Sequence, residues 1–446
     1  MMKERSFLKA VCNIAIPITL QSMLQASFSV VDQIMIGQLG SVSIAGIGLA
    51  GKFSSVYSVL LSAVATIAGI MIAQYIGQKD EAEVRRSFLV NLIVALATAV
   101  LFFLLCLCFP GRIMGLYTSE TATAQAAAGY LRIVSATFLP MAGATLLSTV
   151  LRCREKADDP LYAGIAAALV NTGLNYALIF GKMGFPALGV SGAALATVIA
   201  QFVNFGLIFA MYCRHGKRSG AVAPAEMPQK KAFDFRQYAA MLLPILITEF
   251  MWSLGENVYA MIYGKLGTQS CAAMTLLNPI QSLTIGALSG LSAAASIIIG
   301  KSLGEGDNDR AYRESVKLML YGLCGSAFLS ALLLVTGKYY VRLYQVEEQV
   351  RLTALQILVA YALISPVKVQ NMIVGGGVLR SGGKTKYIMW IDIVGTWVFG
   401  VPLGLCAAFW WKLSIPYVYF ILSLEECVRL GISLLIFRKR GWMQRI

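Results

Sequence analysis

Three acidic residues interrupt apolar stretches that are otherwise long enough to cross a membrane. Asp32 lies near the end of the first stretch, and Glu249 and Glu256 share a later one. An ionised carboxylate is costly in hydrocarbon, so an acid within a span usually faces an aqueous cavity, a counter-charge or a bound cation. Burial favours the neutral form of Asp32, which would let it exchange a proton or a metal cation. The alternative is a carboxylate that snorkels to the outer surface or caps a neighbouring helix.

Amide and hydroxyl side chains in two further apolar stretches have the chemistry of ligands for hard cations. Asn171 and Asn175 are one helical turn apart and therefore share a face, and Thr197 could add a hydroxyl. Hydrogen bonding between helices by the same Asn and Thr side chains explains them equally well. The residues alone leave both explanations open.

Glu249 and Glu256 are close to two helical turns apart, so both point toward one face of their helix. Glu249 lies nearer the predicted midplane, where a transporter would hold a cationic substrate. Pairing of Glu249 with Lys368 or Lys52 is the structural alternative. The roles of the two intramembrane lysines are left open by the sequence.

Other residues near these acids have simpler explanations. Trp252 and Tyr259 could form part of a wall for flat cations, although helix packing or lipid contact is the usual role of such side chains. Glu425 and Arg429 have i,i+4 spacing, which predicts a structural ion pair. Asp392 has no evident partner in the sequence.

The composition excludes a soluble domain. The chain has 446 residues, of which 58% are hydrophobic and 13% charged, and its mean hydropathy is +0.71. Its formal net charge of +15 is spread over short clusters between apolar runs, which predicts membrane topology and no nucleic-acid partner. The nine cysteines show no metal-ligand spacing, and no catalytic motif is present. We therefore expect no enzyme and no cofactor.

Hydropathy and loop residues predict an all-α integral membrane protein with twelve spans. A bilayer requires about 20 apolar residues per helix, and the basic clusters alternate so that they fall on one side together with the N-terminus. The positive-inside rule then places both termini in the cytoplasm and the chain, multi-pass, in the cell membrane. The predicted spans lie near 11–36, 44–73, 87–109, 125–150, 160–181, 189–213, 237–263, 270–300, 315–336, 352–379, 387–411 and 414–437.

An internal duplication organises these spans. A shift of 227 positions pairs the first half of the chain with the second. Each repeat holds six spans, so the two six-helix lobes should share one orientation and be related by a pseudo-twofold axis along the membrane normal. The predicted lobes are 1–213 and 237–446, joined by a polar cytoplasmic linker at 214–236. The paired residues include Pro17 with Pro244, Gly37 with Gly264, Gly77 with Gly304, and Tyr117 with Tyr344.

The order of these motifs resembles the MATE (multidrug and toxic compound extrusion) family, over nearly the whole chain. This family belongs to a superfamily that also includes lipid-linked oligosaccharide flippases. The resemblance rests on Pro17, Val31-Asp32, Gly37 to Gly40, Asn171 to Asn175, Gly192 to Thr197, Thr248-Glu249 and Trp252 to Glu256.

Membership would imply drug or metabolite efflux in exchange for Na⁺ or H⁺. It would also place Asp32 with Asn171, Asn175 and Thr197 in a cation-coupling site of the amino-terminal lobe, where Asp32, Asn171 and Asn175 would bind Na⁺. One branch of the family has an aspartate where this chain has Asn175. Asp32 is thus the only acid expected in that cluster.

The leading hypothesis is a cation-coupled antiporter that exports small cationic or amphipathic molecules by alternating access, working as a monomer in the lipid bilayer. Substrate would be held by Glu249, Glu256, Trp252 and Tyr259. A flippase for a lipid-linked substrate is the second hypothesis, kept open by Lys52 and Lys368. A channel or a membrane-embedded enzyme fits less well, because the sequence has no filter-like loop and no cluster of catalytic residues.

Overall fold

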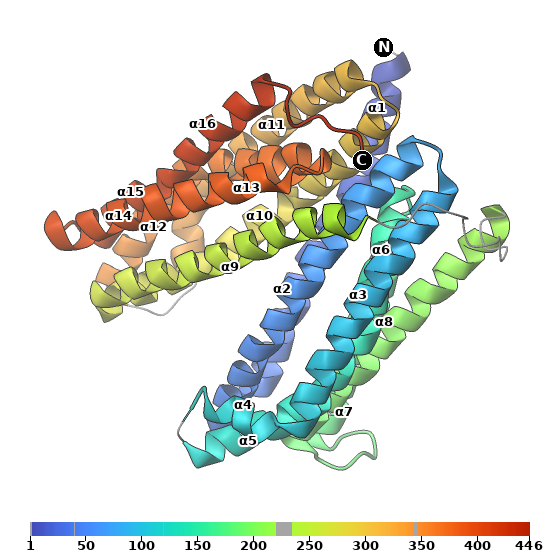
Figure 1. Ribbon diagram of the computed structural model, residues 1–446. Helices are drawn as coiled ribbons and strands as arrows, with labels where there is room; N and C mark the ends of the chain where they lie inside the picture. The colour runs from blue at the N-terminus through green and yellow to red at the C-terminus, as the bar shows by residue number, and fades with distance from the viewer. Residues whose placement is uncertain (1, 40, 119, 220–233, 343–346) are drawn as a thin grey trace. The chain divides into compact units, whose positions relative to one another are not determined.

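The computed structural model describes residues 2–39, 41–118, 120–219, 234–342 and 347–446, and no strand occurs among them (Figure 1). The helices are numbered along the chain, with 3₁₀ and π segments marked η. The first repeat contains α1 (Met2–Gly37), α2 (Ser41–Gly77), α3 (Glu81–Cys108), α4 (Pro110–Gly115), α5 (Thr121–Val134), η1 (Ser135–Thr137), α6 (Phe138–Cys153), α7 (Asp158–Phe180) and α8 (Gly189–Ser219).

The second repeat is equally helical but more often interrupted. Three of its spans include π-helical segments or breaks, which re-aim side chains within a long helix. Its elements are α9 (Phe235–Lys265), α10 (Thr268–Gly304), α11 (Asn308–Arg342), α12 (Glu348–Asn371), η2 (Met372–Leu379), α13 (Thr385–Ile393), η3 (Val394–Gly400), α14 (Val401–Leu405), η4 (Cys406–Trp410), α15 (Ile415–Ser423) and α16 (Glu425–Arg438).

The helices confirm the predicted all-α membrane class. In the part of the chain that the structure describes, eleven helical runs are long and apolar enough to cross a bilayer. The predicted twelfth span corresponds to α15 and α16, which are separated at Leu424. Several helices extend beyond the predicted hydrocarbon core: α11 begins at Asn308, because the Asp307 side chain accepts a hydrogen bond from the Arg310 N–H at 2.8 Å. Polar turns continue these helices outside the apolar run.

The described chain groups into two compact units that do not coincide with the two repeats. Unit 1 contains 1–19, 73–79 and 233–446, and unit 2 contains 20–72 and 80–232. The first half of α1 and the last turns of α2 therefore pack with the second repeat. In unit 2, α7 packs along α8, and α6 packs against α3 and α8; in unit 1, α12 packs against α10, α11 and α15 (Figure 1).

Two glycines allow the end of α2 to pack directly on α10 within unit 1. A Cβ on Gly77 would collide with the backbone carbonyl of Lys301, and a Cβ on Gly304 would collide with that of Gln74. The shift of 227 that pairs Gly77 with Gly304 also pairs Gln74 with Lys301. The contact is thus reciprocal, and it is a close helix crossing of the kind that small residues permit in membranes.

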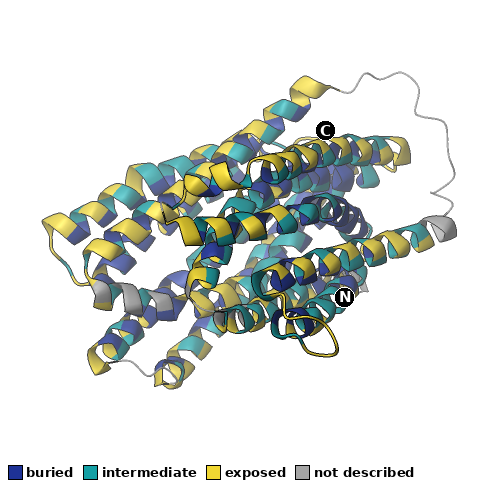
Figure 2. Cartoon of the chain, turned by 90° about the horizontal axis from the view of Figure 1, so that it is seen from below, coloured by how far each residue is buried: buried dark blue, intermediate teal, exposed yellow. Residues whose placement is uncertain are grey.

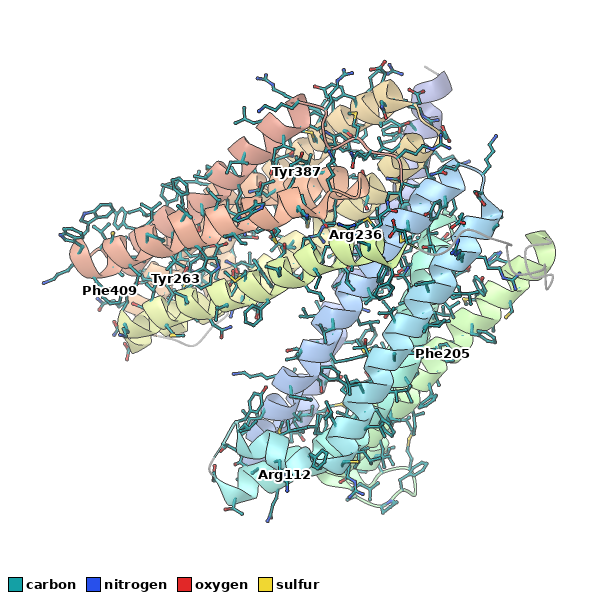
Figure 3. The ribbon with its side chains drawn as sticks, viewed as in Figure 1. Arg112, Phe205, Arg236, Tyr263, Tyr387 and Phe409 are labelled. Atoms are coloured by element: carbon teal, nitrogen blue, oxygen red, sulfur yellow. The ribbon has the colours of Figure 1, made fainter. Side chains whose placement is uncertain are left out.

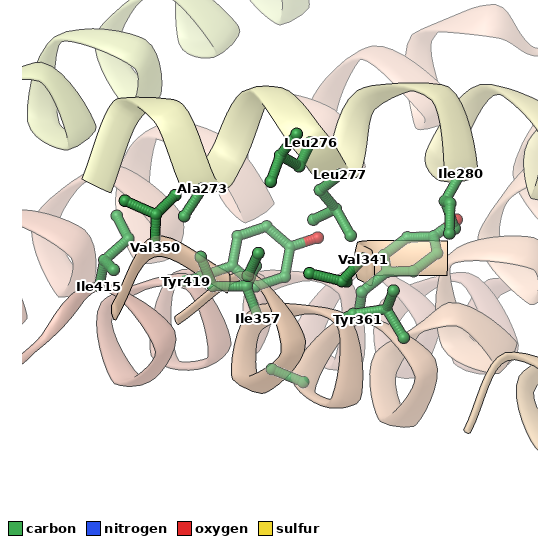
Figure 4. Packing of buried hydrophobic residues seen from close by; sticks show 13 residues of the cluster. Ala273, Leu276, Leu277, Ile280, Val341, Val350, Ile357, Tyr361, Ile415 and Tyr419 are labelled. Atoms are coloured by element: carbon green, nitrogen blue, oxygen red, sulfur yellow. The ribbon is translucent and has the colours of Figure 1, made fainter. Parts of the chain in front are cut away.

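Burial follows one face of most helices. Figure 2 shows dark buried faces alternating with exposed ones along the same ribbons. Many exposed side chains are large and apolar, including Leu101, Phe328 and Leu363, as lipid contact requires. The buried faces form apolar clusters. In one of them, in unit 1, Leu277 of α10, Ile357 of α12 and Ile415 of α15 meet (Figure 4).

Candidate functional site

Asp32 lies in α1 with two amides of α7 directed at its carboxylate. The Asn175 Nδ2 donates to Asp32 Oδ1 at 2.8 Å. When the Asn171 amide is oriented with its nitrogen toward Asp32, it donates to both carboxylate oxygens, at 2.9 and 3.0 Å. Asp32 is half-buried, and no basic side chain forms an ion pair with it among the described residues.

Two further groups complete this cluster in unit 2. Thr197 of α8 lies 3.5 Å from the Asn171 amide and donates its own hydroxyl proton to the Ala193 carbonyl at 3.0 Å. The Tyr130 side chain of α5 also lies beside Thr197. The structure thus brings together Asp32, Asn171, Asn175 and Thr197, and it adds Tyr130, which the sequence did not single out. These donors and acceptors are all hard oxygen and nitrogen groups.

One acceptor in the cluster is left unpaired. Asn175 is 2% exposed, and its Oδ1 has no hydrogen-bond partner within the described ranges. A buried amide oxygen without a donor is unfavourable. Beside a carboxylate, it is an oxygen of the kind that a metal cation or a protonated group engages, so the residues present are chemically suited to Na⁺ or a proton.

The tight α7–α8 hairpin positions these side chains. The loop that joins the two helices begins at Gly181, which has a positive φ of 65°. Its Leu188 N–H donates to the Leu178 carbonyl at 2.8 Å. A Cβ on Gly192 would lie only 2.6 Å from the same carbonyl, so glycine is what allows α8 to approach α7. The close approach places Thr197 against the Asn171 face.

A second group of charged side chains lies in unit 1. The Tyr259 hydroxyl of α9 donates to Glu425 Oε2 at 2.5 Å. Arg429 pairs with Asp392 at 3.2 Å and, more loosely, with Glu426 at 3.8 Å. Glu425, Glu426 and Arg429 are all more than nine-tenths buried. Such buried charges are stable only when they are paired or hydrogen-bonded.

The predicted Glu425–Arg429 ion pair was wrong. Arg429 is directed toward Asp392 of α13 and also donates to the Thr396 hydroxyl at 3.0 Å. Both residues lie in α16, but each has a partner from another helix: Glu425 accepts a hydrogen bond from Tyr259 of α9, and Arg429 is held by Asp392. Asp392, for which the sequence offered no partner, therefore has one.

Tyr259, Glu425 and Glu426 border a cavity of about 290 Å³ within unit 1. Of the predicted substrate residues, Glu256, Trp252 and Tyr259 line it. Tyr263, near the end of α9, lines it as well (Figure 3). Glu249 does not line the cavity, and it forms no hydrogen bond or ion pair in the described part of the chain. The predicted alternative, pairing of Glu249 with Lys368, is also not observed.

Much of the cavity wall was not predicted from the sequence. Lys368 of α12, Glu425 and Glu426 line the cavity with Gln281 and Tyr419. One signal was available: two consecutive acids in an otherwise apolar last span are costly unless they serve a site. The i,i+4 pattern describes contacts within one helix, whereas the partners of these acids come from other helices.

The comparisons with known proteins agree with this architecture. The family model MatE matches residues 17–177 and again 244–406, so it recognises each repeat separately. The two matches begin at Pro17 and Pro244, the residues that the internal duplication pairs. The chain therefore belongs to the MatE (MATE) family, which consists of multi-pass membrane transporters and not of enzymes.

Individual relatives span almost the full chain. It is similar to an uncharacterized transporter, YisQ, of Bacillus subtilis, with 26% identity over 96% of this chain and 94% of the relative. It is also similar to a probable multidrug resistance protein, NorM, of Thermotoga maritima, with 22% identity over 98% and 93% of the two chains. A crystal structure of MATE in complex with MaL6 has the same fold, with a TM-score of 0.87, 18% identity, and coverage of 97% of this chain and 96% of the other.

Proposed function

We propose that the protein is a cation-coupled antiporter that exports organic cations, drugs or metabolites by alternating access, with Na⁺ or H⁺ as the coupling ion. The observation that carries the proposal is Asp32, a half-buried carboxylate within a span that has amide donors but no basic partner in the described chain. An ionised carboxylate within a membrane is energetically costly, and binding of a proton or a cation would remove that cost. The coupling site would consist of Asp32, Asn171, Asn175 and Thr197, with Asp32, Asn171 and Asn175 as ligands of Na⁺.

The substrate would occupy the cavity of unit 1. Three carboxylates line it, together with aromatic side chains such as Trp252, Tyr259 and Tyr263. Carboxylates and aromatic faces both attract organic cations. The names of the relatives, which include a probable multidrug resistance protein, support a small-molecule substrate. Both proposed sites use residues of one chain, so a monomer would suffice.

A flippase for a lipid-linked phosphate is the second candidate. Lys368 favours it, since an ammonium in a cavity could bind a phosphate headgroup. However, Glu256, Glu425 and Glu426 line the same cavity and outnumber the lysine. A phosphate would be repelled by that excess of negative charge, so the cation exporter is the better account.

Replacing Asp32 with Asn should abolish the link between ion and substrate binding. In the wild type, lowering the pH or raising Na⁺ should weaken binding of a cationic dye by about 5- to 150-fold, the usual range for coupled sites. Asp32→Asn keeps the shape of the side chain but removes its charge, so its dye affinity should not depend on either ion. Equilibrium dye binding across pH and Na⁺ concentration measures both proteins. Ion dependence that survives unchanged in Asp32→Asn would exclude Asp32 as the coupling residue.

Glu256→Gln should weaken dye binding, whereas Glu249→Gln should leave it nearly unchanged. Glu256 lines the cavity and Glu249 does not. A lost hydrogen bond or contact to a charged group costs about 1.5–3 kcal/mol, or roughly ten- to 150-fold in affinity. Fluorescence titration of the two variants gives a matched comparison, because the same substitution is made at two positions of α9 that are two helical turns apart. Equal affinities for wild type and Glu256→Gln would move the substrate site elsewhere.

We also propose that both termini and the 214–236 linker lie in the cytoplasm of the cell, as the distribution of basic residues indicates. Single cysteines replacing Ser219 and Gln444 should resist an impermeant thiol reagent in intact cells and react after permeabilisation. A cysteine replacing Lys412, on the opposite side, should react in both. The parent chain with its native cysteines gives the background. Labelling of Ser219→Cys or Gln444→Cys in intact cells would refute the proposed topology.

A further inference from the structure

The cavity of unit 1 contains a cation that belongs to the protein itself. Lys368 of α12 lines the cavity, and its Nζ lies 4.0 Å from Glu426 Oε1. Its side chain is 25% exposed, so Lys368 is not sealed within the apolar packing. A lysine ammonium is a compact charge on a flexible four-carbon chain. It therefore occupies the kind of position that a bound monovalent cation would take.

Glu426 has two polar partners besides Lys368. The Asn371 Nδ2 donates to Glu426 Oε2 at 2.8 Å, and Arg429 lies 3.8 Å from the same oxygen. Lys368 is at the other oxygen, at the longest ion-pair distance of the cluster. If the ammonium moved away, Glu426 would keep both of its other partners. The Lys368 contact is thus the one that can be exchanged at the lowest cost.

The other two carboxylates on the wall lack a cationic partner. Glu256 forms no hydrogen bond or ion pair within the described ranges, and Glu425 has the Tyr259 hydroxyl as its only close polar partner there. The charges of Glu256 and Glu425 interact with Lys368 across the same cavity. Arg429 is engaged by Asp392 and Glu426, so the three carboxylates on the wall outnumber the one ammonium that lines the cavity, and the cavity retains a net attraction for a further cation.

Lys368 has a second neighbour in the cavity besides Glu426. Its Nζ is 5.9 Å from the centre of the Tyr419 ring, within the range of a cation–π contact. Gln281 fixes that ring by donating to the Tyr419 hydroxyl at 2.8 Å, and the ring is packed in the apolar cluster of α10, α12 and α15 (Figure 4). The aromatic face could hold the ammonium while the carboxylates bind something else.

We propose that Lys368 is a built-in cation: it occupies the carboxylate cavity in the absence of ligand and is exchanged there for an external alkylammonium or other monovalent cation. The inference deepens the proposed function, since it takes this cavity as the place where a transported cation binds. Lys368 then determines specificity, because an incoming cation must compete with an ammonium already present. Removing Lys368 should strengthen binding of small cations, whereas a purely structural lysine would weaken binding or leave it unchanged.

The test is thermal unfolding of the full-length protein with n-butylammonium, which reproduces the lysine side chain. A ligand that binds the folded state raises the melting temperature by mass action. The melting temperature of Lys368→Ala should rise with n-butylammonium concentration. The affinity obtained from this rise should be at least about tenfold tighter than that of the wild type, a difference of about 1.4 kcal/mol. Butanol, the neutral analogue, should give no such gain. Lys368→Met with methylammonium provides a second variant, which keeps the packing of the side chain.

The controls separate this inference from the function. Lys368→Arg keeps a cation and should behave as the wild type, and Lys52→Ala removes another intramembrane lysine that does not line the cavity. Adding Glu256→Gln to Lys368→Ala should reduce the gain. Equal stabilisation of wild type, Lys368→Ala and Lys368→Met, or no stabilisation of any of them, would overturn the proposal. Because the assay measures binding alone, failure of the proposed antiport would appear separately, in transport by the wild type.

Discussion

Charge inside hydrocarbon is the constraint from which the rest of this molecule follows. A bilayer offers no water to solvate a carboxylate or a backbone amide, so every such group must find its partner within the protein, in a cavity or in a bound ion. The helices satisfy the backbone. The acids are satisfied in two different ways: Asp32 by neutral amides, and Glu426 and Asp392 by Arg429. The first arrangement leaves a charge for an ion to neutralise, and the second leaves a cavity wall that is acidic.

The two repeats have diverged in this respect. Glu249 and Glu256 stand where the first repeat has Ser22 and Ser29, and Asp32 stands where the second has Tyr259. In the structure the Tyr259 hydroxyl donates a hydrogen bond to Glu425. The position that carries an acid in the first repeat thus carries, in the second repeat, a donor to an acid of another helix. We infer a division of labour, with ion coupling in unit 2 and substrate binding in unit 1. One family model matches both repeats although these polar residues differ.

Local sequence patterns predicted the fold and the first cluster well, but only part of the second. Apolar runs predicted the spans because length and hydropathy are local properties, and Asn171 and Asn175 share a face because they are one turn apart. The partners of Arg429 could not be predicted in the same way. Asp392, which pairs with Arg429, is on α13, and Tyr259, which donates to Glu425, is on α9. Pairing between distant helices depends on tertiary packing, which the i,i+4 rule does not describe.

Transport by the purified protein in liposomes tests the central claim, the coupling of cation gradients to export, most directly. A fluorescent organic cation would be followed while a Na⁺ gradient or a pH gradient is imposed separately. The account predicts that one of these gradients drives the dye in the direction opposite to the ion, and that collapsing this gradient stops net movement. Dye flux that is the same with and without either gradient would contradict cation-coupled antiport.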